Sequence, residues 1–286
     1  MTPRISPPRV FPEATRAARP PAGAAGAADS YRQAGFLFGN EIDLLLEGFM
    51  IEGSVAAASA APRYRTQLMA GVMGLWSRGW LCRLEALHAA EWGNYAAAIP
   101  LIRAAADATA AEALLLETGG AEWSEWVEGG GIALASADHA TEYRLHAFRA
   151  AEILAAHPRL GPLYRVVSDL SMPHFGATLM LAGGDSGPER VAITFGDRDF
   201  HFGLVELVFG WLLELSVSQA ELLLNHADVF NLDPAPAVDG LVTRCQAQSA
   251  GRDRCRVETV EHQGERRYLV LNWRRAPGGA PKRLLL

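Results

Sequence analysis

The sequence predicts a mainly α-helical protein, a multi-helix bundle with a small antiparallel β appendage at the C-terminus. Three observations predict this fold class. Apolar residues recur three and four positions apart through most of residues 30–235, as on the buried face of a helix. Glycine and proline punctuate this pattern at helix-length intervals. After residue 241 apolar and polar residues alternate, which is typical of half-buried strands.

The first predicted segment is a tail over residues 1–29. It is rich in proline, alanine, glycine and arginine and has no apolar periodicity, so we expect it to be disordered. The helical domain, residues 30–235, follows. Its first three helices are expected at 40–60, 63–92 and 95–117. Pro62, a Gly93–Asn94 turn and Gly119–Gly120 separate them.

The second half of the chain continues with helices over residues 139–157, 163–181 and 204–227. Pro173 should kink the middle one. A short hairpin is expected near 190–202, where the pattern alternates around a Gly-Asp turn. Residues 236–286 form the predicted basic β unit, with strands at 241–248, 254–262 and 266–273.

Charge and cysteine content indicate the class of protein. The net charge is −6, but residues 241–286 carry ten basic and four acidic side chains, against 16 and 28 in the first 240. This opposite charge of the two parts of the chain indicates either a C-terminal tail that binds anions or two parts that dock on each other. The three cysteines are too few for a disulfide scaffold, and the N-terminus lacks the apolar core of a signal peptide. Because the most apolar stretch, residues 203–224, contains three glutamates, we expect no membrane span and a cytoplasmic protein.

The stretch Gly184-Asp185-Ser186-Gly187 matches the loop around the nucleophile of trypsin-like serine proteases. Such a site needs a histidine and an aspartate held by β-barrels, whereas helices precede Ser186 here. Glycine, aspartate and serine are also common in turns, such as one that connects a helix to a hairpin. We therefore interpret the stretch as a loop, and we find no supported catalytic residue.

Two helical patterns could bind a metal ion. Glu85 and His88 are three apart and share a helix face, as in di-iron bundles. A second set falls within one face of another helix and comprises His139, Glu142 and His146. Imidazole with carboxylate suits iron, manganese or zinc. The alternative is that these are solvated or internally hydrogen-bonded side chains, because a second Glu-x-x-His motif is missing.

Two motifs predict a polar pocket between helices. The first places Arg103 and Asp107 four apart after Gly93 and Tyr95, and the second is a Tyr-Arg…Ser…His run. The predicted ligand-binding residues are Arg103, Asp107, Tyr164, Arg165, Ser168 and His174. The alternative is a buried hydrogen-bond network that fixes helix packing.

The same motifs resemble a pair of helices in uncharacterised bacterial all-helical proteins, with patterns G-x-Y…L-x-R-x-x-x-E and Y-R-x-L-S…H. The resemblance covers about 80 residues and implies an all-helical fold without implying an activity. Asp107 stands where those proteins have glutamate, and the gap from Ser168 to His174 is longer. Some of these proteins are thought to be near the HEPN nucleases, but Arg165 and His174 are too far apart for their Arg-x4-6-His signature.

Arginines alternate with aromatic residues in the β unit, a composition that suits nucleic acid or another polyanion. The candidates are Arg244, Arg254, Arg256, Arg266, Arg267 and Arg274. The alternative is docking on the acidic helical body. Cys245 and Cys255 would face each other if a hairpin turned at Ala250, so a disulfide could form on oxidation.

Trp76 and Trp80 lie four apart and favour a helix-packing face, with a homodimer contact as the other interpretation. We expect a binding or regulatory module for a small or anionic ligand. The two alternatives are a metal-dependent enzyme in the bundle and a nucleic-acid-binding protein.

Overall fold

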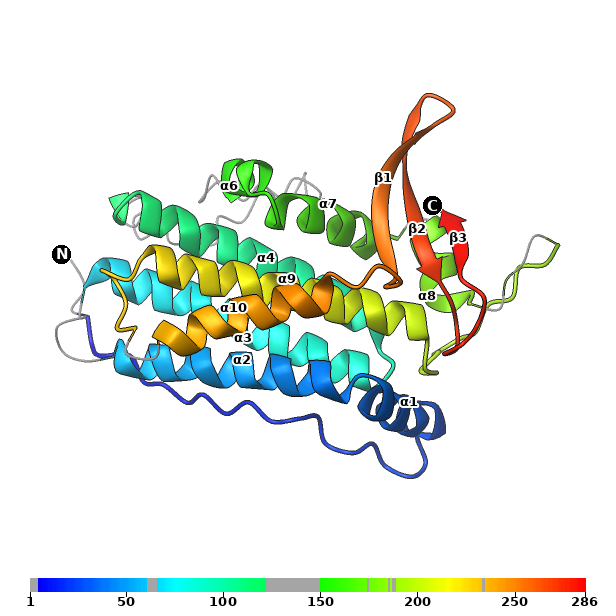
Figure 1. Cartoon of the computed structure of the whole chain (residues 1–286), viewed down its shortest axis with the longest axis horizontal. Coiled ribbons are helices and arrows are strands. Elements are labelled where there is room, and N and C mark those ends of the chain that lie inside the picture. The colour runs from blue at the N-terminus through cyan, green and yellow to red at the C-terminus, as the bar shows by residue number, and fades with distance from the viewer. Residues whose placement is uncertain are drawn as a thin grey trace, which may run out of the picture.

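The computed structural model describes residues 5–60, 66–121, 150–173, 175–184, 186, 189–232 and 235–286. Long helices lie side by side in an elongated bundle, and a small sheet stands at one side (Figure 1). The helices are α1 (Ala25–Leu37), α2 (Gly39–Ala58), α3 (Gln67–Glu91), α4 (Tyr95–Glu117), α6 (Ala150–Ala156), α7 (Leu160–Ser171), α8 (Phe175–Ala182), α9 (Phe202–Asn225) and α10 (Ala235–Ser249). The strands are β1 (Arg256–His262), β2 (Glu265–Trp273) and β3 (Lys282–Leu285). The predicted fold class is confirmed.

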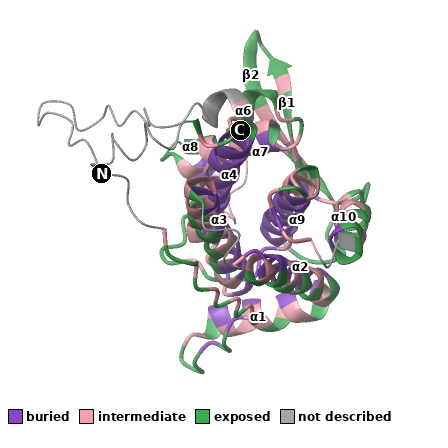
Figure 2. Ribbon diagram, turned by 90° about the vertical axis from the view of Figure 1, so that its left-hand side faces the viewer, coloured by how far each residue is buried: buried purple, intermediate pink, exposed green. Residues whose placement is uncertain are grey.

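Helices α2, α3, α4 and α9 enclose the core, and α4 and α9 are the most continuously buried of them (Figure 2). Large side chains such as Leu45, Phe49, Ile102 and Phe209 fill the space between them. By length and composition α9 could cross a membrane, but 67% of its most apolar window is buried inside the fold. Packing against three other helices therefore accounts for its apolar sequence.

Local sequence sets the helix boundaries. The Thr66 hydroxyl accepts a hydrogen bond from the Met69 amide at 3.1 Å and caps α3. Gly93 adopts φ +70° in the turn before α4, and a Cβ there would lie 2.2 Å from the Arg198 carbonyl oxygen. Only glycine fits both constraints. Pro100 lies in the second turn of α4 without ending it.

The chain before α1 is bound to the bundle. We name residues 5–24 the strap, because they run extended along α2 and α3 before α1 begins at Ala25 (Figure 1). Pro12 packs on Gly53 of α2 so closely that a Cβ at Gly53 would lie 2.2 Å from the Pro12 Cβ. The expectation of a disordered tail over residues 1–29 is therefore wrong for residues 5–29. Composition indicated the lack of regular structure but could not reveal the groove that holds it.

The hairpin expected near 190–202 does not form. Arg190 makes an isolated bridge, and the rest of this segment is loop and turn until α9 begins. Val191, Ile193 and Phe195 are exposed rather than buried on a sheet face. Alternation alone did not produce strands here, because no neighbouring strand pairs with these residues in the described chain. Pro173 also separates α7 from α8 instead of kinking a single helix.

The strand expected at 241–248 is part of a helix, α10, which packs on α9 and α2. Val238, Leu241 and Cys245 are its buried residues, and their spacing of three and four is helical. The alternating pattern of residues 241–248 was therefore misleading. The predicted strand began at Leu241 and left out Val238, whose burial shows that buried positions repeat every three or four residues.

The remaining two predicted strands are confirmed as β1 and β2, joined by a tight turn in which Gln263 and Gly264 both have positive φ. Strand β3 pairs antiparallel to β2, which gives the order β1-β2-β3. The sheet is fixed to the bundle through the N-terminus of α9. There the amides of Phe202 and Gly203 donate to the carbonyls of Arg275 and Arg274 at 3.0 and 2.9 Å.

Candidate ligand-binding site

A buried ion pair lies where α2 meets α3. Arg83 donates from both terminal nitrogens to the Glu52 carboxylate at 2.7 and 2.5 Å, and Trp76 Nε1 donates to the same carboxylate at 2.9 Å. The Arg83 side chain is 0% exposed and that of Glu52 is 2% exposed. Three hydrogen bonds thus satisfy a carboxylate that is out of contact with water.

A second buried polar cluster lies beside the first one, between α4 and α9. Gln219 Nε2 lies 3.0 and 3.1 Å from the two carboxylate oxygens of Glu112, and Thr109 donates to the Gln219 carbonyl oxygen at 3.3 Å. Burial raises the pKa of Glu112 well above its usual value, the Gln219 hydrogen bond opposes this rise, and the nearby Glu52 carboxylate adds to it. Glu112 therefore retains a proton at pH values where an exposed glutamate has lost it.

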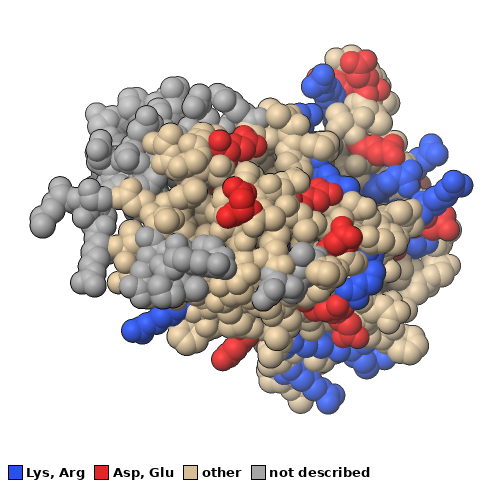
Figure 3. All heavy atoms as spheres, turned by 60° about the vertical axis from the view of Figure 1, so that its left-hand side comes forward, with Lys and Arg blue, Asp and Glu red and all other residues tan. Residues whose placement is uncertain are grey.

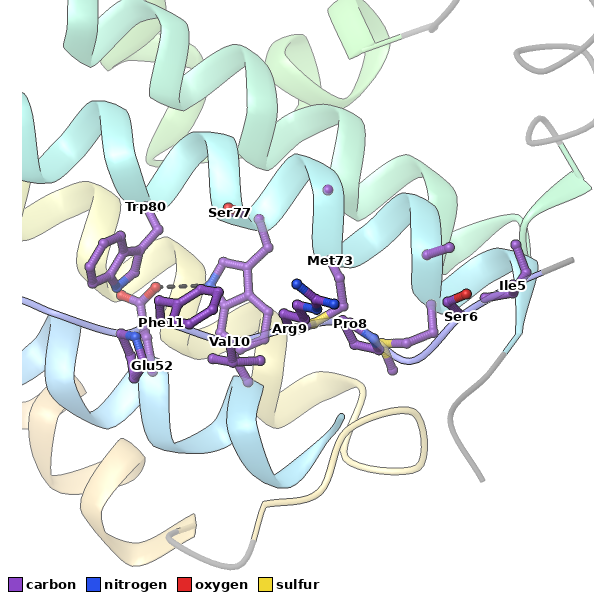
Figure 4. Close-up of a pocket in the computed structure, with 17 residues that line it drawn as sticks. Ile5, Ser6, Pro8, Arg9, Val10, Phe11, Glu52, Met73, Ser77 and Trp80 are labelled. Carbon is purple, nitrogen blue, oxygen red and sulfur yellow. Dashed lines mark hydrogen bonds between the residues drawn. The ribbon is translucent and has the colours of Figure 1, made fainter. Parts of the chain in front are cut away.

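A cavity of about 410 Å³ lies against the outer side of the Glu52 cluster, between α2, α3 and the strap (Figure 4). Its helix wall includes Glu52, Trp76, Trp80 and Met73, and the first residues of the strap form the opposite wall. This volume is within the range of small-molecule sites. Its described lining residues are Ile5, Ser6, Pro8, Arg9, Val10, Phe11, Pro12, Glu52, Gly53, Ala56, Met69, Ala70, Met73, Gly74, Trp76, Ser77 and Trp80.

The strap is attached to α3 chiefly through Glu91. Arg16 Nε donates to Glu91 Oε1 at 2.5 Å, and the amide of Ala17 donates to Oε2 at 3.3 Å. The Arg16 guanidinium also lies 4.3 Å from the centroid of the Tyr31 ring. Burial raises the pKa of Glu91, whose side chain is 0% exposed, and Arg16 opposes that rise.

Two carbonyls of the strap make further contacts with α3 and the residue that follows it. His88 Nε2 lies 2.7 Å from the Thr15 carbonyl oxygen, and Trp92 Nε1 donates to the Ala18 carbonyl oxygen at 2.9 Å. We call residues 12–18 the anchor of the strap, since these contacts and the Pro12 packing all fall within it.

Residues 5–11, which we call the lid, differ from the anchor. They form one wall of the cavity, yet within the described structure none of them hydrogen-bonds to a helix. Phe11 lines the cavity mouth and is 77% exposed. The lid is therefore held by packing alone and through its covalent connection to the anchor.

Three of the six residues of the predicted polar set, Arg103, Asp107 and Tyr164, are brought together between α4 and α7. Asp107 is hydrogen-bonded to Tyr164, and the Arg103 guanidinium lies 5.8 Å from the centroid of the Tyr164 ring. Burial raises the pKa of Asp107, and the hydrogen bond from Tyr164 opposes this rise. Arg103 Nε and the Ser168 hydroxyl are buried without a hydrogen-bond partner. These contacts fit a packing network as well as a pocket.

Arg165, another member of that set, does not join the cluster. Arg165 is exposed, and its positive charge opposes the rise that burial causes in the pKa of Tyr268 of β2. The Tyr268 hydroxyl donates to Asp169. His174 lies outside the described residues.

Of the predicted metal ligands, only Glu85 and His88 are described. His88 Nδ1 lies 3.8 Å from Glu85 Oε2, and its other ring nitrogen faces the strap. His139, Glu142 and His146 lie outside the described residues. Within the described part of the chain, no three His, Cys, Asp or Glu side chains are grouped as a metal site would require.

Most of the predicted nucleic-acid-binding arginines are engaged within the protein. Arg254 pairs with Glu41 of α2, Arg244 with Glu47 of α2, and Arg274 with Glu206 of α9. Two more pair within their own strands, Arg256 with Glu258 and Arg267 with Glu265. Arg266 is exposed on β2.

Positive and negative side chains also intermingle on the surface. On the face seen in Figure 3, basic and acidic residues alternate and form no single basic patch. The contacts thus match the interpretation in which the basic unit docks on the acidic bundle.

Three smaller sequence features also have structural outcomes. The Ser186 hydroxyl donates to the Ala192 carbonyl at 3.2 Å and accepts from the Ala192 amide at 3.0 Å, which fits a loop-closing residue. Cys245 and Cys255 are free and buried, one in α10 and one before β1, so the cross-strand geometry for a disulfide is absent.

The two tryptophans of α3 pack inside the chain. Trp76 is buried against Phe230, and Trp80 donates to the Phe49 carbonyl at 3.2 Å. Helix packing therefore accounts for Trp76, which is inaccessible to a partner chain. Sequence patterns did not reveal the cavity, because half of its wall comes from a segment without periodicity.

Comparison with family models, curated proteins and solved structures found no match for this chain. The resemblance to bacterial all-helical proteins stays a prediction.

Proposed function

We propose that this protein is a binding module for a small ligand, held in the cavity between α2, α3 and the strap. The observation that carries the proposal is that one wall of a ligand-sized cavity is a lid without hydrogen bonds to the helices. A wall held only by packing can move aside to admit a molecule and close over it. A regulatory role and a cytoplasmic location are part of the same proposal.

The lining residues favour a largely apolar ligand. Met69, Met73, Trp76 and Trp80 contribute flexible thioethers and large aromatic surfaces, which adapt to apolar molecules of varied shape. The alternatives, a metal-dependent enzyme and a nucleic-acid-binding protein, have less support. Glu85 and His88 lack a third ligand among the described residues, and five of the six candidate arginines are ion-paired.

The test is a titration with N-phenyl-1-naphthylamine, an uncharged dye whose fluorescence rises in apolar surroundings. We expect saturable binding of one dye per chain. Ala70→Phe, which puts a ring into the cavity from α3, should weaken binding at least tenfold. Ala96→Phe, on the exposed face of α4, is the matched control and should bind as the native protein does.

Thermal unfolding of both variants checks that the fold persists. Equal dye binding by Ala70→Phe and the native protein would contradict the proposal, as would the absence of saturable binding.

A further inference from the structure

The shape of the cavity limits the ligand. Its wall on α3 extends from Met69 to Trp80, which is about 16 Å along the helix at 1.5 Å per residue. The lid runs along the same direction on the opposite side (Figure 4). The site is therefore long and narrow and favours a linear molecule over a compact one.

The charges of the lining residues limit the ligand further. Among the described lining residues only Arg9 and Glu52 are charged. Glu52 already accepts three hydrogen bonds from Arg83 and Trp76, so its charge is compensated inside the bundle. A cationic ligand would find no carboxylate free to receive it.

Arg9 is in the opposite situation. It lies on the lid, its side chain is exposed, and no described residue forms an ion pair with it. Arg9 lines the same cavity as Met73 and Trp80, and all three are labelled in Figure 4. A carboxylate bound there would accept charge-assisted hydrogen bonds while the apolar remainder extends along the tryptophans and methionines.

We infer that the cavity takes an amphipathic carboxylic acid, a linear apolar chain whose acid group pairs with Arg9 on the lid. The inference rests on the proposed function, since it names the ligand class of the same site. Arg9 belongs to the lid, so the bound acid would also hold the lid closed over the chain. Binding and closure are then one event.

The experiment measures the affinity of two probes, decanoate and decanol, by isothermal titration calorimetry at pH 8 and below their aggregation limits. The variants are Arg9→Gln and Arg19→Gln. Arg19 is the matched control, because it is also an exposed arginine of the strap but does not line the cavity. Both variants remove one positive charge from the same segment.

We expect Arg9→Gln to weaken decanoate binding about tenfold, as loss of a hydrogen bond to a charged group does, and to change decanol binding less than about twofold. Arg19→Gln should leave both affinities unchanged. If Arg9→Gln weakens both probes equally, or neither, while decanol still binds, the inference is overturned and the proposed function stands. If neither probe binds the native protein and the dye also fails to bind, the proposed function itself is overturned.

Discussion

Helix α3 takes part in two ion pairs that look alike at close range and differ in their surroundings. On its inner face Arg83 meets Glu52, and near its C-terminal end Glu91 meets Arg16. In both pairs the shortest contact is 2.5 Å and the glutamate is essentially buried. The arginines differ, because Arg83 is 0% exposed on a packed helix and Arg16 is 37% exposed on the strap.

The difference shows that one helix can make one ion pair within the packed core and another with a segment that can detach. Arg83, whose side chain is 0% exposed, cannot reach water without separation of α2 from α3. Glu91 is bound by Arg16 and Ala17 of the strap, so lifting the strap removes both of these partners. The first pair therefore depends on the global fold, and the second on a local opening. The cavity borders the first pair through Glu52 and extends from there along α3 toward its N-terminus.

The largest expected effect is that of Arg83→Met. It leaves the Glu52 carboxylate buried without its main partner, so we expect the free energy of unfolding to fall by about 3–5 kcal/mol. Urea denaturation followed by circular dichroism measures this. Arg78→Met, at an exposed position on the same helix, should cost less than about 1 kcal/mol.

Adding Glu52→Gln to Arg83→Met should recover part of the loss, since it removes the unpaired charge. Failure to recover any stability would mean that lost packing, rather than the lone carboxylate, sets the cost.

A smaller effect is expected for Arg16→Met. Glu91 loses its partner but can become hydrated when the strap detaches, so we expect a loss of about 1–2 kcal/mol. The strap should then be cut after Glu13 by a glutamate-specific protease faster than in the native protein, with the bundle left intact. A loss as large as that of Arg83→Met would mean that strap and bundle unfold together, and the contrast between the two pairs would fail.

The smallest effect concerns Glu112, the buried carboxylate whose partner is neutral. Its folded-state pKa is raised by burial, so between pH 4.5 and the raised pKa the folded protein keeps a proton that the unfolded chain has lost. Stability from this group is complete below pH 4.5 and falls as pH rises. Glu112→Gln should remove that part of the fall, as urea denaturation from pH 4 to pH 9 would show.

The control for this experiment is Glu117→Gln, at an exposed position on the same helix. It should leave the slope of stability against pH unchanged. A slope that is equal in the native protein and Glu112→Gln would disprove the role given to Glu112.

Helix periodicity predicted most of the bundle because burial repeats at a fixed interval along α2, α3, α4 and α9. Alternation was a poorer guide. It predicted β1 and β2, which pair with each other, but also residues 190–202, which form no strand in the described structure, and residues 241–248, whose burial is helical. Strand formation depends on a neighbour, and the alternating segment does not specify one.

The candidate site divides in the same way. Arg103 and Asp107 are one helical turn apart, so their proximity follows from local geometry. The position of the cavity does not follow from local geometry. The strap is held by Arg16, whose partner Glu91 is 75 positions away, and by backbone carbonyls, groups that every residue possesses. Glu52 and Arg83 lie 31 positions apart, and only the packing of two helices joins them.

The bond between the start of α9 and the carbonyls of Arg274 and Arg275 has a consequence for synthesis on the ribosome. The first amides of α9, a long and largely apolar helix, are separated from their acceptors by about 70 residues of sequence. During translation α9 therefore leaves the ribosome with these amides unpaired and with its apolar side chains exposed to solvent. The nascent chain is therefore most in need of a chaperone late, after α9 has left the exit tunnel and before residues 274 and 275 follow.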